Sequence, residues 1–304
     1  MASESLGCCT IVKGKIGIAT VLYNSGEVLA EFLASLRSQT YTNFVVYVVD
    51  NASVDNSAEQ CSLAGDRFIV TINKRNTGFA YGTNQGIRQA LEDGCEYVLL
   101  LNNDVAFEAD FLDRFVKGME RTAADIGAPL TFYYDRPNII WAAGGRFQRW
   151  AGYRPLHLGM EQQYSAEFAQ DRLIQFSPGS GLMAHRRVFE RIGFLDETFF
   201  TYWEDTDFSV RALKAGLRSY LIPKARLWHK VSSLTGMNSE FQRFYAVRNH
   251  ALYIAKHCGP LEATLLHGIY LTAYRLIGLL RLRTDERVAF WKKGIEIART
   301  AGYK

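Results

Sequence analysis

Four short apolar segments, each followed by a polar turn, constrain the fold of this chain more than any other feature of its sequence. They span residues 16–22, 44–49, 68–72 and 97–101. Short apolar runs without polar alternation are typical of strands that are buried on both faces, as in a parallel sheet covered by helices. A chain of 304 residues is long enough to bury such a sheet in one large domain or two small ones.

Helical patterns separate these segments. Apolar side chains recur at helical spacing from about Glu27 to Arg37, and the Gly-rich segment NTGFAYGTNQG opens a second helix that runs to about Leu91. The polar turn from Asp50 to Ser53 is of the kind that caps a following helix. Strands that alternate with helices in this way predict an α/β fold with a mainly parallel sheet flanked by helices.

Polar residues gather where three of the predicted strands end. The clusters are Asp50-Asn51, the segment Asn76–Asn84 and the tripeptide Asn102–Asp104. Ligands of such sheets bind beyond the carboxyl ends of the strands. Asn, Asp and Gly also populate ordinary turns, and a turn would explain any one cluster alone. Three clusters at successive strand ends favour a ligand site.

The second half of the chain is less regular. Gly and aromatic residues from Ile140 to Tyr153 show no clear period, which predicts a mobile or acceptor-facing loop. The other expected elements are a strand at Leu173–Ser177, a turn at PGSG, a helix at Arg186–Ile192, a strand at Arg218–Ile222, a helix at Glu240–His257 and an apolar segment at Leu261–Leu282. The last two predict a helical C-terminal extension after the α/β domain.

Acidic residues point to the chemistry. Glu204, Asp205 and Asp207 form the densest acidic cluster beside aromatic residues, at the start of an expected helix. Capping favours acids there but explains one of them better than three, so a catalytic carboxylate is the stronger interpretation. Asp104, after an apolar strand, suits a hard divalent cation that also binds phosphate oxygens. His229 also follows an apolar strand, where a lone histidine is more often structural than a ligand.

Composition and charge narrow the class of protein. The five cysteines form no CxxC pair, so we expect a reducing, cytoplasmic setting and neither a disulfide framework nor a zinc site. The first residues show neither a basic start nor a long apolar run, so no secretory signal is expected. The net charge of +4 comes from residues 275–304, where eight Lys or Arg outnumber three acids. We expect no nucleic-acid partner.

Six motifs in series resemble those of one family. The order IATVLYNS, VVDNASVDNS, NTGFAYGTNQGI, LLLNNDV, GFLDETFFTYWEDTDFSVRALKAG and LWHKVSS is similar to that of the inverting family 2 glycosyltransferases, which have the Rossmann-like GT-A fold. Finer details resemble the bacterial rhamnosyltransferase-like branch, which builds cell-surface polysaccharide. The resemblance covers about residues 15–255.

The resemblance implies roles for particular residues. Asp205 would be the general base, with Glu204 beside it, and at its usual pKa of about 4 it would be ionised at neutral pH without tuning. Asp104 would ligate Mg²⁺ or Mn²⁺ from the DxD position, and His229 would be a second metal ligand. The residues expected to bind the nucleotide are Leu22, Tyr23, Asp50 (on the base), Asn51, Asn76, Gly78, Asn84, Asn102, Asn103 and Arg248 (on the diphosphate).

One position departs from the family pattern. Asn102 stands where the DxD motif has its first Asp. An amide can bind a ribose but is a weaker metal ligand than a carboxylate, so metal affinity without the donor should be low. Arg248-Asn249 resembles a signature of the rhamnosyltransferase-like branch, although a helical arginine is as often a surface ion-pair partner.

The resemblance also implies an organisation and an activity. We expect a GT-A domain over residues 1–235, with a nucleotide-binding half at 15–105 and an acceptor half at 106–235, and a helical extension over 236–304. The enzyme would move rhamnose or another hexose from a UDP- or dTDP-sugar to a saccharide or lipid-linked acceptor. Segment 260–304 would rest on anionic lipid at the inner face of the cell membrane. A helical hairpin or an oligomer interface is the alternative for that segment.

Three other functions are less well supported. A nucleotidyltransferase would need a basic Gly-rich loop after the first strand, and LYNSGEV has none. A dehydrogenase would need GxGxxG at the same place. A non-catalytic carbohydrate-binding protein could use Trp141, Trp150, Tyr153 and Trp203 as stacking platforms, but it would not need Asp50, Asp104 and Asp205 together.

Overall fold

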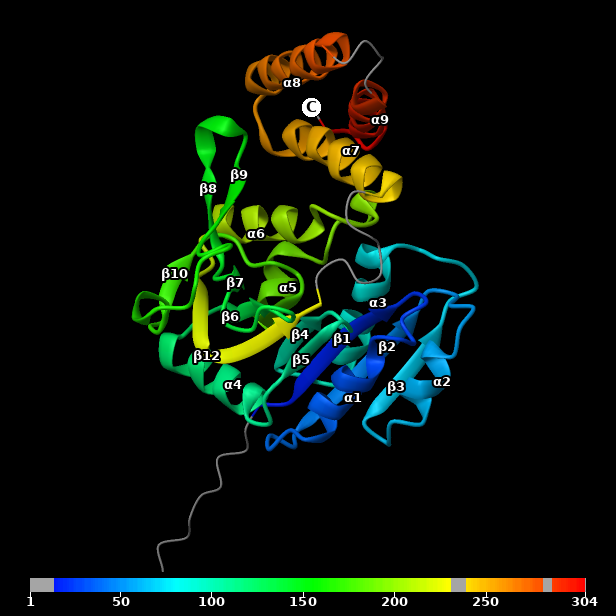
Figure 1. Ribbon diagram of the computed structural model, residues 1–304, viewed down its shortest axis with the longest axis vertical. Coiled ribbons are helices and arrows are strands. Elements are labelled where there is room, and N and C mark those ends of the chain that lie inside the picture. The colour runs from blue at the N-terminus through cyan, green and yellow to red at the C-terminus, as the bar shows by residue number, and fades with distance from the viewer. Residues whose placement is uncertain (1–13, 231–238, 281–285, 304) are drawn as a thin grey trace, which may run out of the picture.

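The structure is a computed structural model that describes residues 14–230, 239–280 and 286–303 (Figure 1). Its strands are β1 Ile16–Leu22, β2 Phe44–Asp50, β3 Phe68–Ile72, β4 Tyr97–Leu101, β5 Val105–Phe107, β6 Ile126–Tyr133, β7 Ile140–Ala142, β8 Gly145–Gln148, β9 Arg154–His157, β10 Arg172–Ile174, β11 Gly181–His185 and β12 Ser219–His229. Its α-helices are α1 Leu29–Arg37, α2 Ser57–Ser62, α3 Phe79–Glu92, α4 Phe111–Thr122, α5 Arg186–Ile192, α6 Glu204–Lys214, α7 Glu240–His257, α8 Pro260–Leu280 and α9 Glu286–Thr300.

A single large sheet organises the α/β part. Its strand order is β10-β12-β6-β11-β4-β1-β2-β3, with β5 on β12 and β7 on β6. Strands β1 to β4 pair in parallel, and β11 enters antiparallel between β4 and β6. The carboxyl ends of β1 and β4 therefore meet at one edge of the sheet. The predicted α/β fold with a mainly parallel sheet is confirmed.

Helices cover both faces of the sheet. Apolar side chains of α1 and α4 pack on one face, around Phe32 and Phe115. Helices α3, α5 and α6 pack on the other face, around Ile87 and Phe208. Burial on both faces is the reason why β1, β2 and β4 are apolar runs, whereas β3 is the edge strand and leaves Ile69 and Ile72 exposed.

Four local predictions were wrong. The segment Ile140–Tyr153 is not an irregular loop, because it forms β7 and the hairpin of β8 and β9. The strand predicted at Leu173–Ser177 is the shorter β10, and β12 runs seven residues beyond its predicted end at Ile222. The turn after β2 caps no helix: Asp50 Oδ2 accepts a hydrogen bond from the backbone N–H of Ser53, and α2 begins only at Ser57.

Helices α7 to α9 form a separate layer beyond the carboxyl edge of the sheet (Figure 1). Gly294 of α9 lies against the backbone of α7: a Cβ there would come within 2.1 Å of the Arg248 carbonyl oxygen. Trp291 is fully buried between the helices. The expected helical extension is present, while its boundary near residue 235 lies outside the described residues.

Candidate active site

A pocket of about 510 Å³ opens at the carboxyl ends of β1 and β4. Its walls come from the loop after β4, the PGSG loop before β11, the segment that opens α6, the end of β12, the β8–β9 hairpin and α7. Six of the predicted site residues line it: Asn102, Asn103, Asp104, Glu204, Asp205 and His229. Segments as far apart as residues 102 and 229 are thus brought to one place by the sheet topology.

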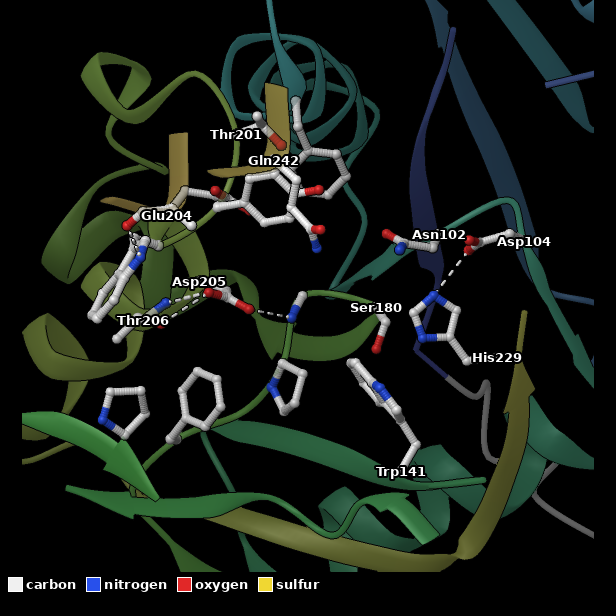
Figure 2. A pocket seen from close by; sticks show the side chains of 18 of the residues that line it. Asn102, Asp104, Trp141, Ser180, Thr201, Glu204, Asp205, Thr206, His229 and Gln242 are labelled. Atoms are coloured by element: carbon white, nitrogen blue, oxygen red, sulfur yellow. Dashed lines mark hydrogen bonds and ion pairs between the residues drawn. The ribbon is translucent and has the colours of Figure 1, made fainter. Parts of the chain in front are cut away.

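Asp104 and His229 form a pair on one side of the pocket (Figure 2). The Nε2 atom of His229 lies 3.1 Å from Asp104 Oδ1, and both side chains are largely buried. Antiparallel pairing of β5 with the end of β12 brings the two residues together. Trp141 contacts the imidazole edge to face, with ring centroids 4.7 Å apart. The two predicted metal ligands are therefore neighbours.

The chemistry of this pair fits a divalent cation that is shared with a ligand. Mg²⁺ and Mn²⁺ in nucleotide sites are commonly held by one or two carboxylates and by substrate phosphates. Asp104 supplies one carboxylate, and His229 Nδ1 is buried without a hydrogen-bond partner among the described residues. The described residues contain no cluster of three or more His, Cys, Asp or Glu that could hold a metal by themselves. Such a cation would need further ligands from a bound molecule or water.

Asp205 and Glu204 lie on the other side of the pocket, in the first turn of α6 (Figure 2). Asp205 Oδ2 accepts a hydrogen bond of 2.9 Å from the backbone N–H of Gly179. Its Oδ1 accepts hydrogen bonds from the Thr206 N–H at 2.6 Å and from the Thr206 hydroxyl at 3.1 Å. Glu204 is also buried, and its Oε2 has no hydrogen-bond partner in the described part of the chain.

The two carboxyl groups have different electrostatic surroundings. Burial raises the pKa of Glu204 to about 8, and the neighbouring charges of Asp205 and Asp207 act in the same direction. Burial also raises the pKa of Asp205, while the Gly179 and Thr206 hydrogen bonds and the charge of His157 oppose that rise. The expectation of an untuned Asp205 is therefore wrong, because the side chain is buried. Both shifts disfavour the charged form, but only the Asp205 carboxylate accepts hydrogen bonds that oppose the rise of its pKa.

The backbone that leads into α6 is strained. Phe200, Tyr202 and Trp203 have φ angles of 66°, 64° and 75°, in the left-handed region that non-Gly residues rarely adopt. Each such residue costs about 1–3 kcal/mol and persists only where the surroundings hold it. The strain lies directly before Glu204 and Asp205, so whatever holds this segment also positions the two acids.

Arg248 and Asn249 of α7 hold that strained segment. Arg248 Nη2 donates to the carbonyls of Thr198 and Phe199, at 2.6 and 3.0 Å. The amide of Asn249 donates to the carbonyls of Phe199, Thr201 and Tyr202, at 2.7 to 2.8 Å. Arg248 is buried and does not line the pocket. In this structure its guanidinium binds backbone rather than an anion.

The side-chain amides of three predicted nucleotide-binding residues form hydrogen bonds within the protein: those of Asn51, Asn84 and Asn103. The amide of Asn51 donates to the Gly78 carbonyl and accepts from Asn73 and Thr77. Asn84 joins α3 to the backbone of Leu195 through a reciprocal pair of hydrogen bonds. The Asn103 amide donates to the Val21 carbonyl and the Ser25 hydroxyl. These amides shape the carboxyl edge of the sheet, and their predicted contacts with a nucleotide stay predictions.

The remaining predicted nucleotide-binding residues lie beside the pocket and do not line it. Asp50, at the end of β2, is buried, and its Oδ1 has no hydrogen-bond partner among the described residues. Leu22 is fully buried in the core, and Tyr23 next to it is half exposed. Asn76 accepts a hydrogen bond from the N–H of Gly78.

Several pocket residues were not predicted from the sequence. Gly179 and Ser180 belong to the PGSG turn, which gave no sign that its N–H would bind a carboxylate. His157 enters from β9 of the hairpin, in a segment for which no element was predicted. Trp141 was considered only as a carbohydrate platform. A Gly-rich turn that faces an acidic helix start is the one signal that could have identified Gly179.

Asp207 has a structural role. It is fully buried, with Arg211 Nε at 2.8 Å, Lys256 Nζ at 2.7 Å and His257 Nε2 at 2.8 Å from its oxygens. These partners hold its pKa well below the usual range, although burial acts the other way. Asp207 therefore ties α6 to α7 and does not face the pocket.

The sequence of this chain matches that of a known family. The profile of glycosyl transferase family 2 matches residues 18–193, which is more than half of the chain. The chain therefore belongs to glycosyl transferase family 2, which sets aside the nucleotidyltransferase and dehydrogenase alternatives. It is 26% identical over 250 residues to the dTDP-rhamnosyl transferase RfbF of Shigella flexneri, covering 80% of each chain. It is 25% identical to the N-acetylglucosaminyl-diphospho-decaprenol L-rhamnosyltransferase of Mycobacterium tuberculosis, over 86% of this chain and 92% of that one.

Solved structures share the fold. GalNAc-T7, in a crystal structure with UDP, GalNAc and Mn²⁺, superposes with a TM-score of 0.64 at 14% identity, covering 81% of this chain and 48% of that one. The mannosyltransferase PcManGT from Pyrobaculum calidifontis, in complex with GDP-Man and Mn²⁺, superposes with a TM-score of 0.55 at 15% identity, covering 96% and 77%. At these identities the likeness shows the fold alone.

Proposed function

We propose that this glycosyltransferase moves rhamnose or another hexose from a UDP- or dTDP-sugar to a saccharide or lipid-linked saccharide in cell-surface polysaccharide synthesis. One observation carries the proposal: a buried carboxylate, Asp205, lies across one pocket from the Asp104–His229 pair. Such a pocket offers a proton acceptor on one side and a place for a diphosphate on the other. Two relatives, a dTDP-rhamnosyl transferase and an N-acetylglucosaminyl-diphospho-decaprenol L-rhamnosyltransferase, support the donor and acceptor classes.

The proposed reaction is a single displacement at the anomeric carbon. The acceptor hydroxyl attacks, its oxygen forms the new bond to the sugar, and the bond from that carbon to the diphosphate oxygen breaks with its electron pair. Asp205 takes the hydroxyl proton as general base. Its hydrogen bonds to Gly179 and Thr206 fix the carboxylate and oppose the rise of its pKa on burial. Attack opposite the leaving group inverts the anomeric configuration.

Asp104 and His229 would hold Mg²⁺ or Mn²⁺ together with the donor diphosphate. The cation would supply positive charge that offsets the charge of the leaving group. Trp141 packs on His229 and fixes the orientation of the ring. We propose a cytoplasmic location, at the inner face of the cell membrane, because nucleotide sugars are the donors.

Nucleotide binding and turnover test the proposal separately. The full chain is heated with UDP, dTDP or GDP, with and without Mn²⁺. We expect UDP or dTDP to raise the unfolding temperature, more so with Mn²⁺, because a ligand that binds only the native state stabilises it. Asp104→Ala should lose the Mn²⁺-dependent part of this rise in unfolding temperature.

Asp205→Asn tests the proton acceptor. We expect it to keep the nucleotide-induced shift while nucleotide release from the donor in the presence of acceptor falls at least about 100-fold. Asp110→Asn, at a partly exposed acid directly before α4, is the matched control and should behave as the wild type. Full activity of Asp205→Asn would refute its role. A flat response of folded protein to every pyrimidine diphosphate would favour the non-catalytic carbohydrate-binding alternative.

A further inference from the structure

Helix α8 carries an apolar face that no described part of the chain covers. Its large side chains that are more than half exposed are Leu261 at 88%, Leu265 at 64%, Ile269 at 52%, Leu276 at 56%, Leu279 at 76% and Leu280 at 84%. They recur at spacings of three, four and seven, so they form one stripe along the helix. The opposite face, with Tyr270 and Tyr274, packs around Trp291. Helix α8 lies at the end of the molecule that is farthest from the sheet (Figure 1).

The tip of the β8–β9 hairpin extends this surface. Trp150, at the tip, is 80% exposed. Two residues further on, Gly152 lies against the start of the helical layer: a Cβ there would come within 2.9 Å of Leu266 Cδ1 and 3.2 Å of Cys258 Sγ. The tip and α8 are therefore in contact, and Trp150 lines one cleft with Glu262 in the first turn of α8.

Charge on the same elements is positive. Residues 141–160 contain three arginines, Arg146, Arg149 and Arg154, all exposed, and no acid. Along α8 the only exposed charge is Arg275, and the one acid, Glu262, is partly buried in the first turn. An apolar stripe with tryptophan and arginine at its edge is the composition of an interfacial helix that binds anionic lipid.

Helix α8 is long and apolar enough to cross a membrane by length and composition. The packing of the two neighbouring helices argues against a membrane-spanning α8. Helix α7 precedes it and α9 follows it, yet these two helices pack on each other at Gly294 and Arg248. A spanning α8 would place them on opposite sides of the bilayer. A helix of 21 residues, about 30 Å long, that lies flat on the surface keeps this packing intact.

We propose that the stripe on α8 and the tip of the β8–β9 hairpin dock this protein on an anionic lipid surface, beside a lipid-linked acceptor. The acceptor part rests on the proposed function. The same hairpin and the same helical layer line the pocket, through Pro155 and His157 on one and Gln242 and Ala246 on the other. A second copy of the chain is the weaker candidate, because one helix stripe about 30 Å long offers less than the roughly 800 Å² per partner of a stable interface.

Vesicle flotation of the full chain tests the surface. Vesicles are made of phosphatidylcholine alone or with 30% phosphatidylglycerol, and the fraction of protein that floats is measured. We expect flotation with the anionic vesicles and little with the neutral ones. The variant Leu265→Glu/Leu276→Glu should lower the affinity for the anionic vesicles about 100-fold, because each leucine inserted in the bilayer interface supplies a factor of about ten. Trp150→Ala should lower it less.

Leu63→Glu is the matched control, since Leu63 is 76% exposed at the end of α2, on the α/β domain. It should float as the wild type does. No flotation of the wild type with either vesicle would overturn the proposal, as would equal flotation of Leu265→Glu/Leu276→Glu. A concentration-dependent dimer in sedimentation equilibrium that this double variant abolishes would assign the stripe to a second copy instead. Nucleotide-induced stabilisation, measured on the same variants, reports the proposed function independently of lipid.

Discussion

At the scale of single residues, the central fact is that two adjacent carboxyl groups have different surroundings. Asp205 accepts three hydrogen bonds, whereas Glu204 Oε2 has no partner among the described residues. Hydrogen bonds to a carboxylate favour its charged form, and burial without them favours the protonated form. Asp205 is therefore the better placed of the two acids to act as a base, because its hydrogen bonds oppose the effect of burial on its pKa.

This difference predicts how stability depends on pH. The pKa of Glu204 is about 8 in the folded protein and about 4.5 without the fold. The folded state therefore binds more protons than the unfolded state between these values, and stability falls as pH rises from about 4.5 to 8. Glu204→Gln removes this term, so we expect the wild-type unfolding temperature to fall relative to that of the variant by about 2–5 °C between pH 5 and pH 8.

Thermal unfolding of the wild type and of Glu204→Gln between pH 5 and pH 8 tests this prediction. Glu59→Gln, an exposed glutamate of α2, serves as the control and should follow the wild type at every pH. Parallel curves for wild type and Glu204→Gln would show that Glu204 titrates as an exposed acid does.

At the scale of elements, the sequence predicted those strands and helices that depend on a local pattern of apolar residues. Burial on both faces made β1 and β4 continuous apolar runs, and their bounds were predicted correctly. The partners of the asparagine side chains were harder to predict. Asn84 binds the backbone of Leu195, 111 residues away, and the polarity of an Asn does not show whether its amide will meet protein or ligand. The hairpin of β8 and β9 was missed because its Gly and aromatic residues alternate irregularly.

The strained segment before α6 carries a prediction about Arg248. If its guanidinium positions the catalytic turn, Arg248→Lys should lower kcat by about 10–100-fold, because a small misplacement of a reacting group is costly. The affinity for nucleotide should change little. A lysine cannot bridge the carbonyls of Thr198 and Phe199 as a planar guanidinium does.

Steady-state kinetics and nucleotide-induced thermal shifts separate the two roles of Arg248. Arg243→Lys is the control on the same helix, since Arg243 forms an exposed ion pair with Glu286. A large loss of nucleotide affinity in Arg248→Lys, with kcat unchanged, would instead assign Arg248 to the diphosphate, as the family resemblance implied.

At the scale of the whole molecule, the helical layer is joined to the α/β domain by a buried charge network. Lys256 of α7 lies 2.5 Å from Asp196 Oδ2 and 2.7 Å from Asp207 Oδ1. Tyr303, after α9, donates to Asp196 at 2.5 Å. The layer that bears the proposed lipid surface is thereby held against α6, the helix that carries Asp205. Docking of the helical layer on lipid would therefore set the position of α6 relative to the lipid surface.

Removal of the central charge should therefore weaken the whole assembly. Asp207→Asn keeps the size of the side chain but leaves Arg211 without its anion and Lys256 with Asp196 alone. Breaking a buried ion pair on one side costs about 3–5 kcal/mol, so we expect a clear drop in the unfolding temperature. Asp110→Asn breaks an exposed pair with Arg114 and should cost no more than about 1 kcal/mol. Equal unfolding temperatures for the two variants would mean that solvent screens the network and that α7 is held mainly by its apolar contacts.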